Sequence, residues 1–154
     1  MSLRIKVRND NGLVARGGDM AFSGMSLGEC MNRRMILLAD DEVLIRRLVQ
    51  PHLERAGFQT VLAENGASAV ELAIKEAPEV IILDIVMPEM DGLAALRLLK
   101  SMENTRTIPV IIISARYDDA TQQEAKKCGA ACFLTKSFSP AQLLAEIRRV
   151  VGSE

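Results

Sequence analysis

The chain has 154 residues, 49% of them hydrophobic, and a formal net charge of -1. This length suits one domain with its own hydrophobic core, and no apolar run approaches the ~20 residues that a membrane-spanning helix needs. The nearly balanced charge argues against a surface built for nucleic acid. We therefore expect a soluble, single-domain protein.

Residues 1–34 differ in composition from the rest of the chain. They hold six Lys and Arg against three Asp and Glu, with scattered glycines and no sustained apolar period. We expect a flexible N-terminal extension or leader here, followed by a folded domain over residues 35–154. One exception is the strict alternation of Leu3–Arg8, which could pair at a sheet edge or with another copy of the chain.

From Met35 onward, short apolar runs alternate with segments of helical period, a pattern typical of βα units around a parallel sheet. Five strands are predicted, each bounded by turn residues. They cover Met35–Ala39, Phe58–Ala63, Val80–Asp84, Val110–Ser114 and Ala131–Thr135.

The segments between and after these strands predict five helices. In the first, apolar residues at helical spacing from Ile45 to Ala56 form one stripe that includes Leu48. Asn65 is placed to cap the second helix, and Ser139 opens the fifth. Right-handed crossovers then give an α/β fold of the flavodoxin-like type, a doubly wound five-stranded parallel sheet of order 2-1-3-4-5 with helices on both faces.

Polar side chains follow four of the predicted strands. Asp40 and Asp41 follow the first strand, Asp84 ends the third, Ser114 ends the fourth and Lys136 follows the fifth. Because the carboxyl ends of parallel strands meet at one edge of the sheet, we expect these side chains to lie together. Three carboxylates so close repel one another unless a cation lies among them, and Mg²⁺ fits best because it takes carboxylates, waters and phosphoryl oxygens. No histidine or cysteine is at hand for zinc.

These residue types together predict a phosphoryl-acceptor site. Asp84 can attack phosphorus as a carboxylate nucleophile and form an acyl phosphate. Asp41, with Asp40 acting directly or through water, would hold the ion that neutralises the incoming phosphoryl group. Lys136 would supply an ammonium to one phosphoryl oxygen and Ser114 a hydroxyl to another.

Two motifs carry a resemblance to a known family that covers all of the chain but its beginning. Leu37–Glu42 is similar to the acidic motif of the family's first strand, and Asp84–Gly92 to its phosphoacceptor motif, with Met-Pro and Met-Asp-Gly in place. From Met35 to Val151 the chain resembles the receiver domain of two-component response regulators, a chemotaxis-type phosphoacceptor fold. The resemblance implies phosphorelay signal transduction, in which Asp84 accepts a phosphoryl group from a kinase histidine.

The resemblance also implies roles for the neighbouring residues. Ser114 and Lys136 would contact the phosphoryl group. Ser114 and Phe133, the aromatic residue three positions before the lysine, would move together on phosphorylation. The implied Mg²⁺ ligands are the carboxylates of Asp40, Asp41 and Asp84 and the backbone carbonyl of Val86.

The partners implied by the resemblance are a sensor histidine kinase or a phosphotransfer protein, and a downstream output protein or domain, with no direct contact to nucleic acid or membrane. The chain is not expected to be an enzyme beyond self-phosphorylation and self-dephosphorylation. Cys30, Cys128 and Cys132 lack metal-ligand spacing, and no signal peptide is recognisable. Reduced thiols in the cytoplasm are therefore expected.

Two residues, Ser137 and Phe133, depart from the family's usual pattern, and a third, Val86, bears on how long the phosphoryl group stays bound. Ser137 follows Lys136 where the family usually has a proline joined by a cis peptide, and a cis bond to another residue type costs ~2.5–4 kcal/mol. Either the loop keeps a strained cis bond or it aims Lys136 in another way. Phe133 stands where the family frequently has a tyrosine, so no phenol hydroxyl is available for a hydrogen bond at the surface. A partner that detects the position of this ring must therefore do so through apolar contacts. Val86 cannot orient an attacking water, which predicts slow self-dephosphorylation.

Two other functions stay open at this point. An aspartate-nucleophile phosphatase of the haloacid dehalogenase type shares the sheet and the Mg²⁺, but it needs a second acid two residues after the nucleophile, where this chain has Val86. The other is a pseudo-receiver that acts only as a binding scaffold, against which the intact acids and Lys136 argue. Three residues follow Val151, so we expect no output module there. A stand-alone regulator, a relay intermediate and a piece of a longer regulator or hybrid kinase all fit.

Overall fold

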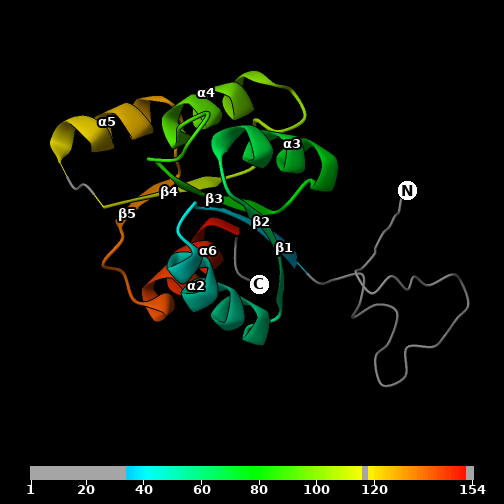
Figure 1. Cartoon of the computed structure of the whole chain (residues 1–154). Helices are drawn as coiled ribbons and strands as arrows, with labels where there is room; N and C mark the ends of the chain where they lie inside the picture. Colours follow the sequence, from blue (N-terminus) through cyan, green and yellow to red (C-terminus); the bar gives the residue numbers. More distant parts are fainter. Residues whose placement is uncertain (1–33, 116–117, 152–154) are drawn as a thin grey trace, which may run out of the picture. The chain divides into compact units, whose positions relative to one another are not determined.

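The computed structural model describes residues 34–115 and 118–151, which are coloured in Figure 1. Within these ranges, strands and helices alternate along the chain, and no helix has the length and apolar character needed to cross a membrane. The strands are β1 (Arg34–Ala39), β2 (Phe58–Ala63), β3 (Val80–Asp84), β4 (Val110–Ser114) and β5 (Cys132–Thr135). The helices are α2 (Val43–Arg55), α3 (Gly66–Glu76), α4 (Gly92–Ser101), α5 (Asp119–Lys127) and α6 (Pro140–Val151).

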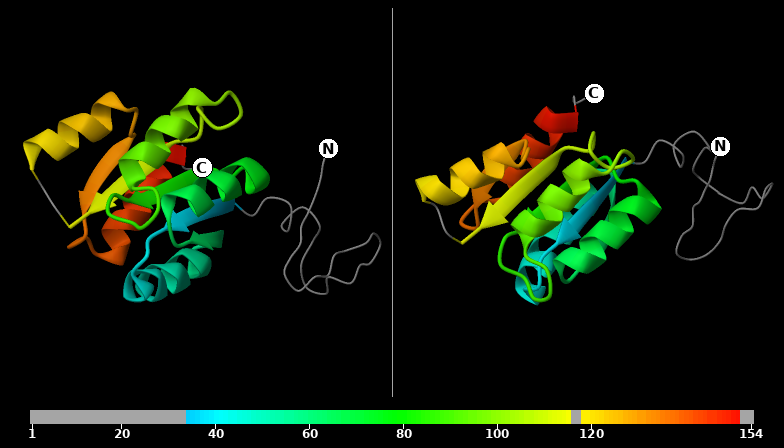
Figure 2. Two further views of the ribbon diagram at one scale, coloured as in Figure 1. Left: turned by 45° about the horizontal axis from the view of Figure 1, so that its top comes forward. Right: turned by 90° about the horizontal axis from the view of Figure 1, so that it is seen from above.

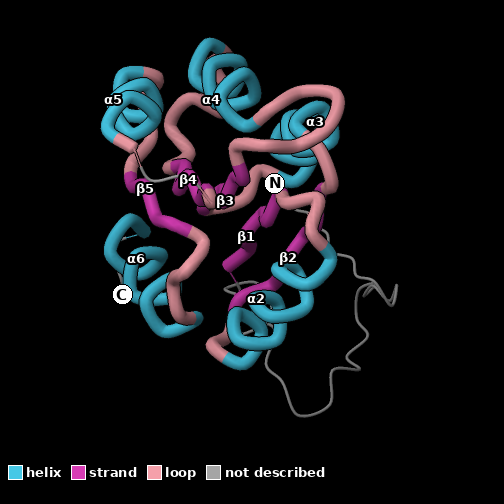
Figure 3. The backbone as a smooth tube through the Cα atoms, turned by 60° about the vertical axis from the view of Figure 1, so that its left-hand side comes forward, coloured by secondary structure: helices cyan, strands magenta, loops and turns pink. Residues whose placement is uncertain are grey.

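The strands form one parallel sheet of order β2-β1-β3-β4-β5, which confirms the predicted topology. Each predicted strand begins within one residue of the observed one. Helices α3, α4 and α5 cover one face of the sheet, and α2 and α6 cover the other (Figure 3). In Figure 2 the strand arrows end at the same edge of the sheet. The predicted extension, residues 1–34 with the alternation near its start, lies outside the described residues except for Arg34.

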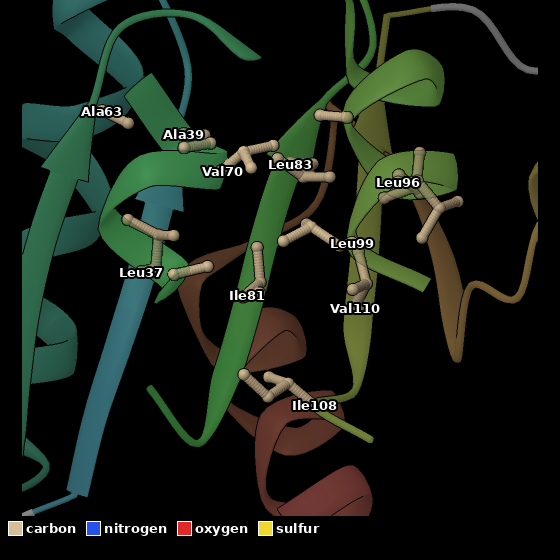
Figure 4. Packing of buried hydrophobic residues seen from close by; sticks show 14 of the residues in the cluster. Leu37, Ala39, Ala63, Val70, Ile81, Leu83, Leu96, Leu99, Ile108 and Val110 are labelled. Carbon is tan, nitrogen blue, oxygen red and sulfur yellow. The ribbon is translucent and has the colours of Figure 1, made fainter. Parts of the chain in front are cut away.

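Side chains on alternate residues of each central strand build two hydrophobic layers. On β3, Ile81 and Leu83 belong to the layer under α3 and α4, where Leu99 is also fully buried (Figure 4). Val80 and Ile82 of the same strand belong to the layer under α2 and α6. Burying one such side chain stabilises the fold by about 1.5–3 kcal/mol. A strand covered on both faces meets solvent only at its ends, so polar side chains are placed there.

Side-chain caps fix where two of the helices begin. The Asn65 side chain accepts a hydrogen bond from the Ser68 amide at 2.7 Å, as predicted for the start of α3. The Asp91 side chain accepts one from the Ala94 amide at 2.8 Å and starts α4 in the same way. Caps of this kind stabilise a helix by about 1 kcal/mol. The cap at Asp91 therefore fixes the point where the loop after β3 enters α4.

The apolar stripe of α2 is narrower in the structure than in the sequence pattern. Val49 and Leu53 are 1% exposed, but Leu48 is 45% exposed. Placing Leu48 on the buried stripe was therefore wrong. On this face only α2 and α6 share the sheet, so the outer margin of the stripe meets no covering helix within the described ranges.

Candidate functional site

Three carboxylates gather where β1 and β3 end. Asp40 directly follows β1, and Asp84 is the last residue of β3, its neighbour in the sheet. One carboxylate oxygen from each of Asp40, Asp41 and Asp84 lies within 4.8 Å of the other two. Asp40 is fully buried and Asp84 is 2% exposed, whereas Asp41 is exposed. The predicted acidic cluster is therefore present, with Asp41 on its solvent side.

Lys136 reaches this cluster from the loop after β5. Its ammonium nitrogen Nζ lies 2.9 Å from Asp84 Oδ2, 3.2 Å from Asp40 Oδ2 and 3.3 Å from Glu42 Oε1. The lysine side chain is only 12% exposed. Its backbone amide donates to the Ser114 carbonyl at 2.8 Å, so the end of β4 helps to place it. The sequence indicated Lys136 but not its third acidic partner, Glu42, whose only signal was its place directly after the acid pair.

Burial controls the protonation of the innermost groups. Removal from solvent raises the pKa of Asp84 from 3.8 to about 6, opposed by the hydrogen bond from Lys136 and reinforced by the charge of Asp40. Burial also raises the pKa of Asp40. Burial alone would lower the pKa of Lys136, but its hydrogen bond to Asp84 and the charges of both acids raise it. The site holds more negative than positive charge and so favours a further cation.

The carboxylate oxygens fit a hard divalent cation. Asp40 Oδ2 is buried and accepts no hydrogen bond from the described residues, although it forms an ion pair with Lys136 Nζ at 3.2 Å. The other oxygen of this side chain, Oδ1, accepts from the Glu42 amide at 2.8 Å. A buried acceptor left unsatisfied costs about 1–3 kcal/mol, and more when it is charged. Mg²⁺ prefers carboxylate oxygens together with water, which the exposed side chain of Asp41 allows.

The other predicted site residues surround this cluster. Ser114, 1% exposed, ends β4 and pairs with Thr135 of β5 in the parallel register. Phe133 is partly buried against the layer under α3, α4 and α5. The Val86 side chain is 66% exposed, while a hydrogen bond from its backbone amide lowers the pKa of Asp84 against the effect of burial. Ser114 thus lies at the same end of the sheet as the acidic cluster, whereas Phe133 lies within β5, two residues before Thr135.

The loop after β5 aims Lys136 without a cis bond. All peptide bonds of the described residues are trans, including the one between Lys136 and Ser137. The hydroxyls of Ser137 and Thr135 lie 2.7 Å apart, and the Phe138 amide donates to the Thr135 carbonyl at 3.1 Å. Phe138 is buried in the layer under α2 and α6. A turn of trans peptide bonds, anchored by a buried ring, therefore follows Lys136.

Two glycines let the loop after Asp84 fold tightly. A Cβ atom on Gly92 would collide with the backbone carbonyl of Asp84. A Cβ atom on Gly66 would collide with the Met90 carbonyl, which accepts a hydrogen bond from the Gly66 amide at 2.9 Å. Met87 is buried in the same loop. The Asp84–Gly92 motif thus owes several of its residue types to this close packing, and Gly66 is a contributor that the sequence did not indicate.

The chain matches a family of known proteins at this site and fold. Residues 36–148 match the model of the response regulator receiver domain, and the chain belongs to that family. It is therefore a phosphoacceptor receiver domain of two-component signalling, as the motifs predicted.

Curated relatives are longer than this chain. It is 40% identical over 118 residues to the phosphate regulon transcriptional regulatory protein PhoB of Klebsiella pneumoniae, covering 77% of this chain and 52% of that protein. It is 36% identical over 120 residues to the transcriptional regulatory protein GltR of Pseudomonas aeruginosa, covering 78% and 50%. The chain spans about half the length of these relatives.

Solved receiver structures share the fold. The chemotaxis protein CheY4 of Vibrio cholerae matches with a TM-score of 0.73 and 30% identity, over 77% of this chain and 98% of that one. The receiver domain of the sensor histidine kinase PA1611 of Pseudomonas aeruginosa, which has a magnesium ion coordinated in its active-site cleft, matches with a TM-score of 0.73 and 27% identity, over 79% and 99%. The predicted flavodoxin-like fold is confirmed.

Proposed function

We propose that Asp84 accepts a phosphoryl group from the phosphohistidine of a sensor histidine kinase or a phosphotransfer protein. The observation that carries this proposal is the 2.9 Å contact of Lys136 Nζ with Asp84 Oδ2 beside the cluster of three carboxylates. A carboxylate oxygen of Asp84 forms the new bond to phosphorus as the bond between phosphorus and the histidine nitrogen breaks, and the imidazole keeps the electron pair. Lys136 then neutralises one phosphoryl oxygen.

The proposed Mg²⁺ ligands are the carboxylates of Asp40, Asp41 and Asp84 and the backbone carbonyl of Val86. When bound, the ion neutralises negative charge on the phosphoryl oxygens and on the acids around them. The buried Asp40 Oδ2 without a hydrogen-bond partner supports this assignment, as does the magnesium ion in the receiver domain of PA1611. The carboxylates of Asp40 and Asp41 supply the charge that retains the ion, and Asp84 remains free to present its second oxygen to phosphorus.

The proposed switch runs from Ser114 to Phe133. The Ser114 hydroxyl binds a phosphoryl oxygen. A displacement of Ser114 shifts Thr135, its partner in β5, and Thr135 lies two residues along the strand from Phe133. The phosphorylated state then differs at the face formed by α5, β5 and α6. A downstream output protein or domain binds this face, in agreement with the curated relatives, which are named as transcriptional regulators.

The proposal also includes the cellular compartment and the extent of the domain. We place it in the cytoplasm, where Cys128 and Cys132, both free in the structure, stay reduced. The domain itself contacts neither nucleic acid nor membrane, and its chemistry is limited to self-phosphorylation and self-dephosphorylation. We propose that the residues before β1 are an extension to the receiver domain, whose first strand begins at Arg34.

Intact mass spectrometry after incubation with Mg²⁺ and acetyl phosphate tests this function. One phosphoryl adduct that requires Mg²⁺ is expected, and it should be absent from Asp84→Asn and present in Asp119→Asn, a control at an exposed acid. Continuous turnover of phosphate esters would instead indicate a phosphatase, which the valine at position 86 opposes. Neither adduct nor turnover would indicate a binding scaffold.

A further inference from the structure

Arg46 contacts the acidic site from the side of α2. Its guanidinium Nη1 donates a hydrogen bond to the backbone carbonyl of Asp40. The arginine lies in the first turn of α2 and is partly buried, while Asp40 is fully buried. A hydrogen bond from a charged donor is about twice as strong as one between neutral groups. The contact therefore joins the start of α2 to the backbone that carries a proposed metal ligand.

The segment from Asp40 to Glu42 is held by a short series of hydrogen bonds. The Asp40 amide donates to the Ala63 carbonyl of β2 at 3.0 Å, and the Glu42 amide donates to Asp40 Oδ1 at 2.8 Å. The Arg46 backbone amide donates to the Glu42 carbonyl at 3.3 Å. The Arg46 side chain then reaches back over this segment to the carbonyl of Asp40. Backbone and side chain of one arginine thus hold both ends of the segment.

We propose that Arg46 is a positioning residue of the metal site. By fixing the backbone of residues 40–42, it keeps the carboxylates of Asp40 and Asp41 directed at the same point as Asp84. This inference rests on the proposed function, because it takes Mg²⁺ as the ion bound there. It assigns Arg46 no contact with the ion or with the phosphoryl group.

The direction in which Mg²⁺ affinity changes on removal of Arg46 distinguishes a positioning role from a purely electrostatic one. A guanidinium close to three carboxylates repels a divalent cation, so removing an arginine that acted through charge alone would tighten Mg²⁺ binding. Removing an arginine that positions the ligands weakens binding even though a positive charge has gone. Arg47 is the matched control, because it is the next residue of α2, is exposed, and its side chain makes no hydrogen bond or ion pair with the described residues.

Calorimetric titration of the full chain with Mg²⁺, at a temperature well below each variant's unfolding transition, tests the proposal. Arg46→Gln should weaken Mg²⁺ binding by about tenfold or more, as expected for the loss of one hydrogen bond from a charged donor. Arg47→Gln should leave the affinity unchanged or slightly increased. Arg46→Lys should fall between, since lysine keeps the charge but not the planar, forked donor. In the metal-free protein, the Glu42 amide should exchange with solvent faster in Arg46→Gln than in Arg47→Gln.

Equal Mg²⁺ affinities and equal Glu42 exchange in Arg46→Gln and Arg47→Gln would overturn this proposal alone. An unmodified chain that binds no Mg²⁺ would overturn the proposed metal site as well. If Arg46→Gln does not fold, Arg46→Lys is compared with Arg47→Lys instead. Weaker binding in Arg46→Lys supports the positioning role, and equal binding overturns it.

Discussion

Lys136 Nζ lies 2.9 Å from Asp84 Oδ2, and the same ammonium lies within 3.3 Å of Asp40 and Glu42. One largely buried cation therefore contacts three acids, two at the ends of neighbouring strands and one at the start of α2. Because Asp84 Oδ2 is next to the ammonium before any phosphoryl group is bound, little movement is needed for Lys136 to contact a phosphoryl oxygen. The lysine stabilises the acidic cluster first and the proposed phosphorylated state afterwards.

Replacing Lys136 with methionine should slow phosphorylation of the chain by acetyl phosphate. Loss of one charge-assisted contact to the phosphoryl group costs about 1.4–3 kcal/mol of transition-state stabilisation, or roughly 10- to 160-fold in rate. The rate is followed by the growth of the phosphoryl adduct in intact mass spectra at fixed Mg²⁺. Lys127→Met, at an exposed lysine of α5, is the control and should phosphorylate at the normal rate. A normal rate in Lys136→Met would remove the lysine from the proposed mechanism.

The pKa of Asp84 predicts a pH-dependent stability in buffer without Mg²⁺. Burial raises this pKa from 3.8 to about 6, so between these values the folded protein binds a proton that the unfolded chain has released. Stability contributed by this group is therefore present below about pH 4 and lost as the pH rises to about 6. Above pH 6 the buried charge of Asp84 costs the folded state about 1–3 kcal/mol.

Asp84→Asn removes this cost and should be more stable than the unmodified chain at pH 7. The gain should shrink as the pH is lowered and disappear below about pH 3, where Asp84 is protonated in both the folded and the unfolded protein. Chemical denaturation at a series of pH values measures the difference in the free energy of unfolding. A variant that is less stable than the unmodified chain at pH 7 would contradict the raised pKa.

The residue two positions after Asp84 should control how long a phosphoryl group stays bound. The Val86 side chain is 66% exposed and offers no group that could orient an attacking water. Val86→Asn adds an amide that can hydrogen-bond such a water and should accelerate self-dephosphorylation several-fold. Loss of the adduct after removal of the phosphodonor gives the rate in both proteins. Equal or slower loss in the variant would count against this role.

Gly92→Ala should destabilise the fold through a clash at Asp84. The new Cβ atom would meet the Asp84 backbone carbonyl, and the backbone must shift, at a cost of about 1–3 kcal/mol. Gly57→Ala is the matched comparison, because a Cβ atom there meets nothing within 4 Å and the cost comes from its positive φ alone, about 1 kcal/mol. The free energy of unfolding separates the two mechanisms. A smaller loss in Gly92→Ala than in Gly57→Ala would show that the loop adapts easily.

The fold could be predicted because its elements obey local rules. The runs at Val80–Asp84 and Val110–Ser114 are apolar up to their last, polar residue, as strands covered on both faces require, and each is followed by turn residues and a capped helix. Asn65 caps α3 as predicted. Leu48 was misplaced, because helical spacing gives the direction of a side chain but not the extent of the surface that covers it.

The site could be predicted only in part, for a similar reason. Asp40, Asp84 and Lys136 stand at strand ends, so topology alone brings them together. Glu42 is the N-cap residue of α2 and Arg46 lies in the first turn of that helix. A charged side chain at such a position is ordinarily expected to be exposed to solvent. Their contacts with Lys136 and with the Asp40 carbonyl depend on how α2 is oriented on the sheet, and no local pattern encodes that orientation.

Chemical trapping of the phosphorylated residue is the measurement that tests the central claim most directly. Borohydride reduces an acyl phosphate to an alcohol, so an aspartyl phosphate becomes homoserine at the position that carried the phosphoryl group. After incubation with Mg²⁺ and acetyl phosphate, then reduction and proteolysis, peptide mass spectrometry should locate homoserine at position 84 and at no other aspartate. Reduction at a different acid, or at none in a folded protein that binds Mg²⁺, would contradict the assignment of Asp84 as phosphoacceptor.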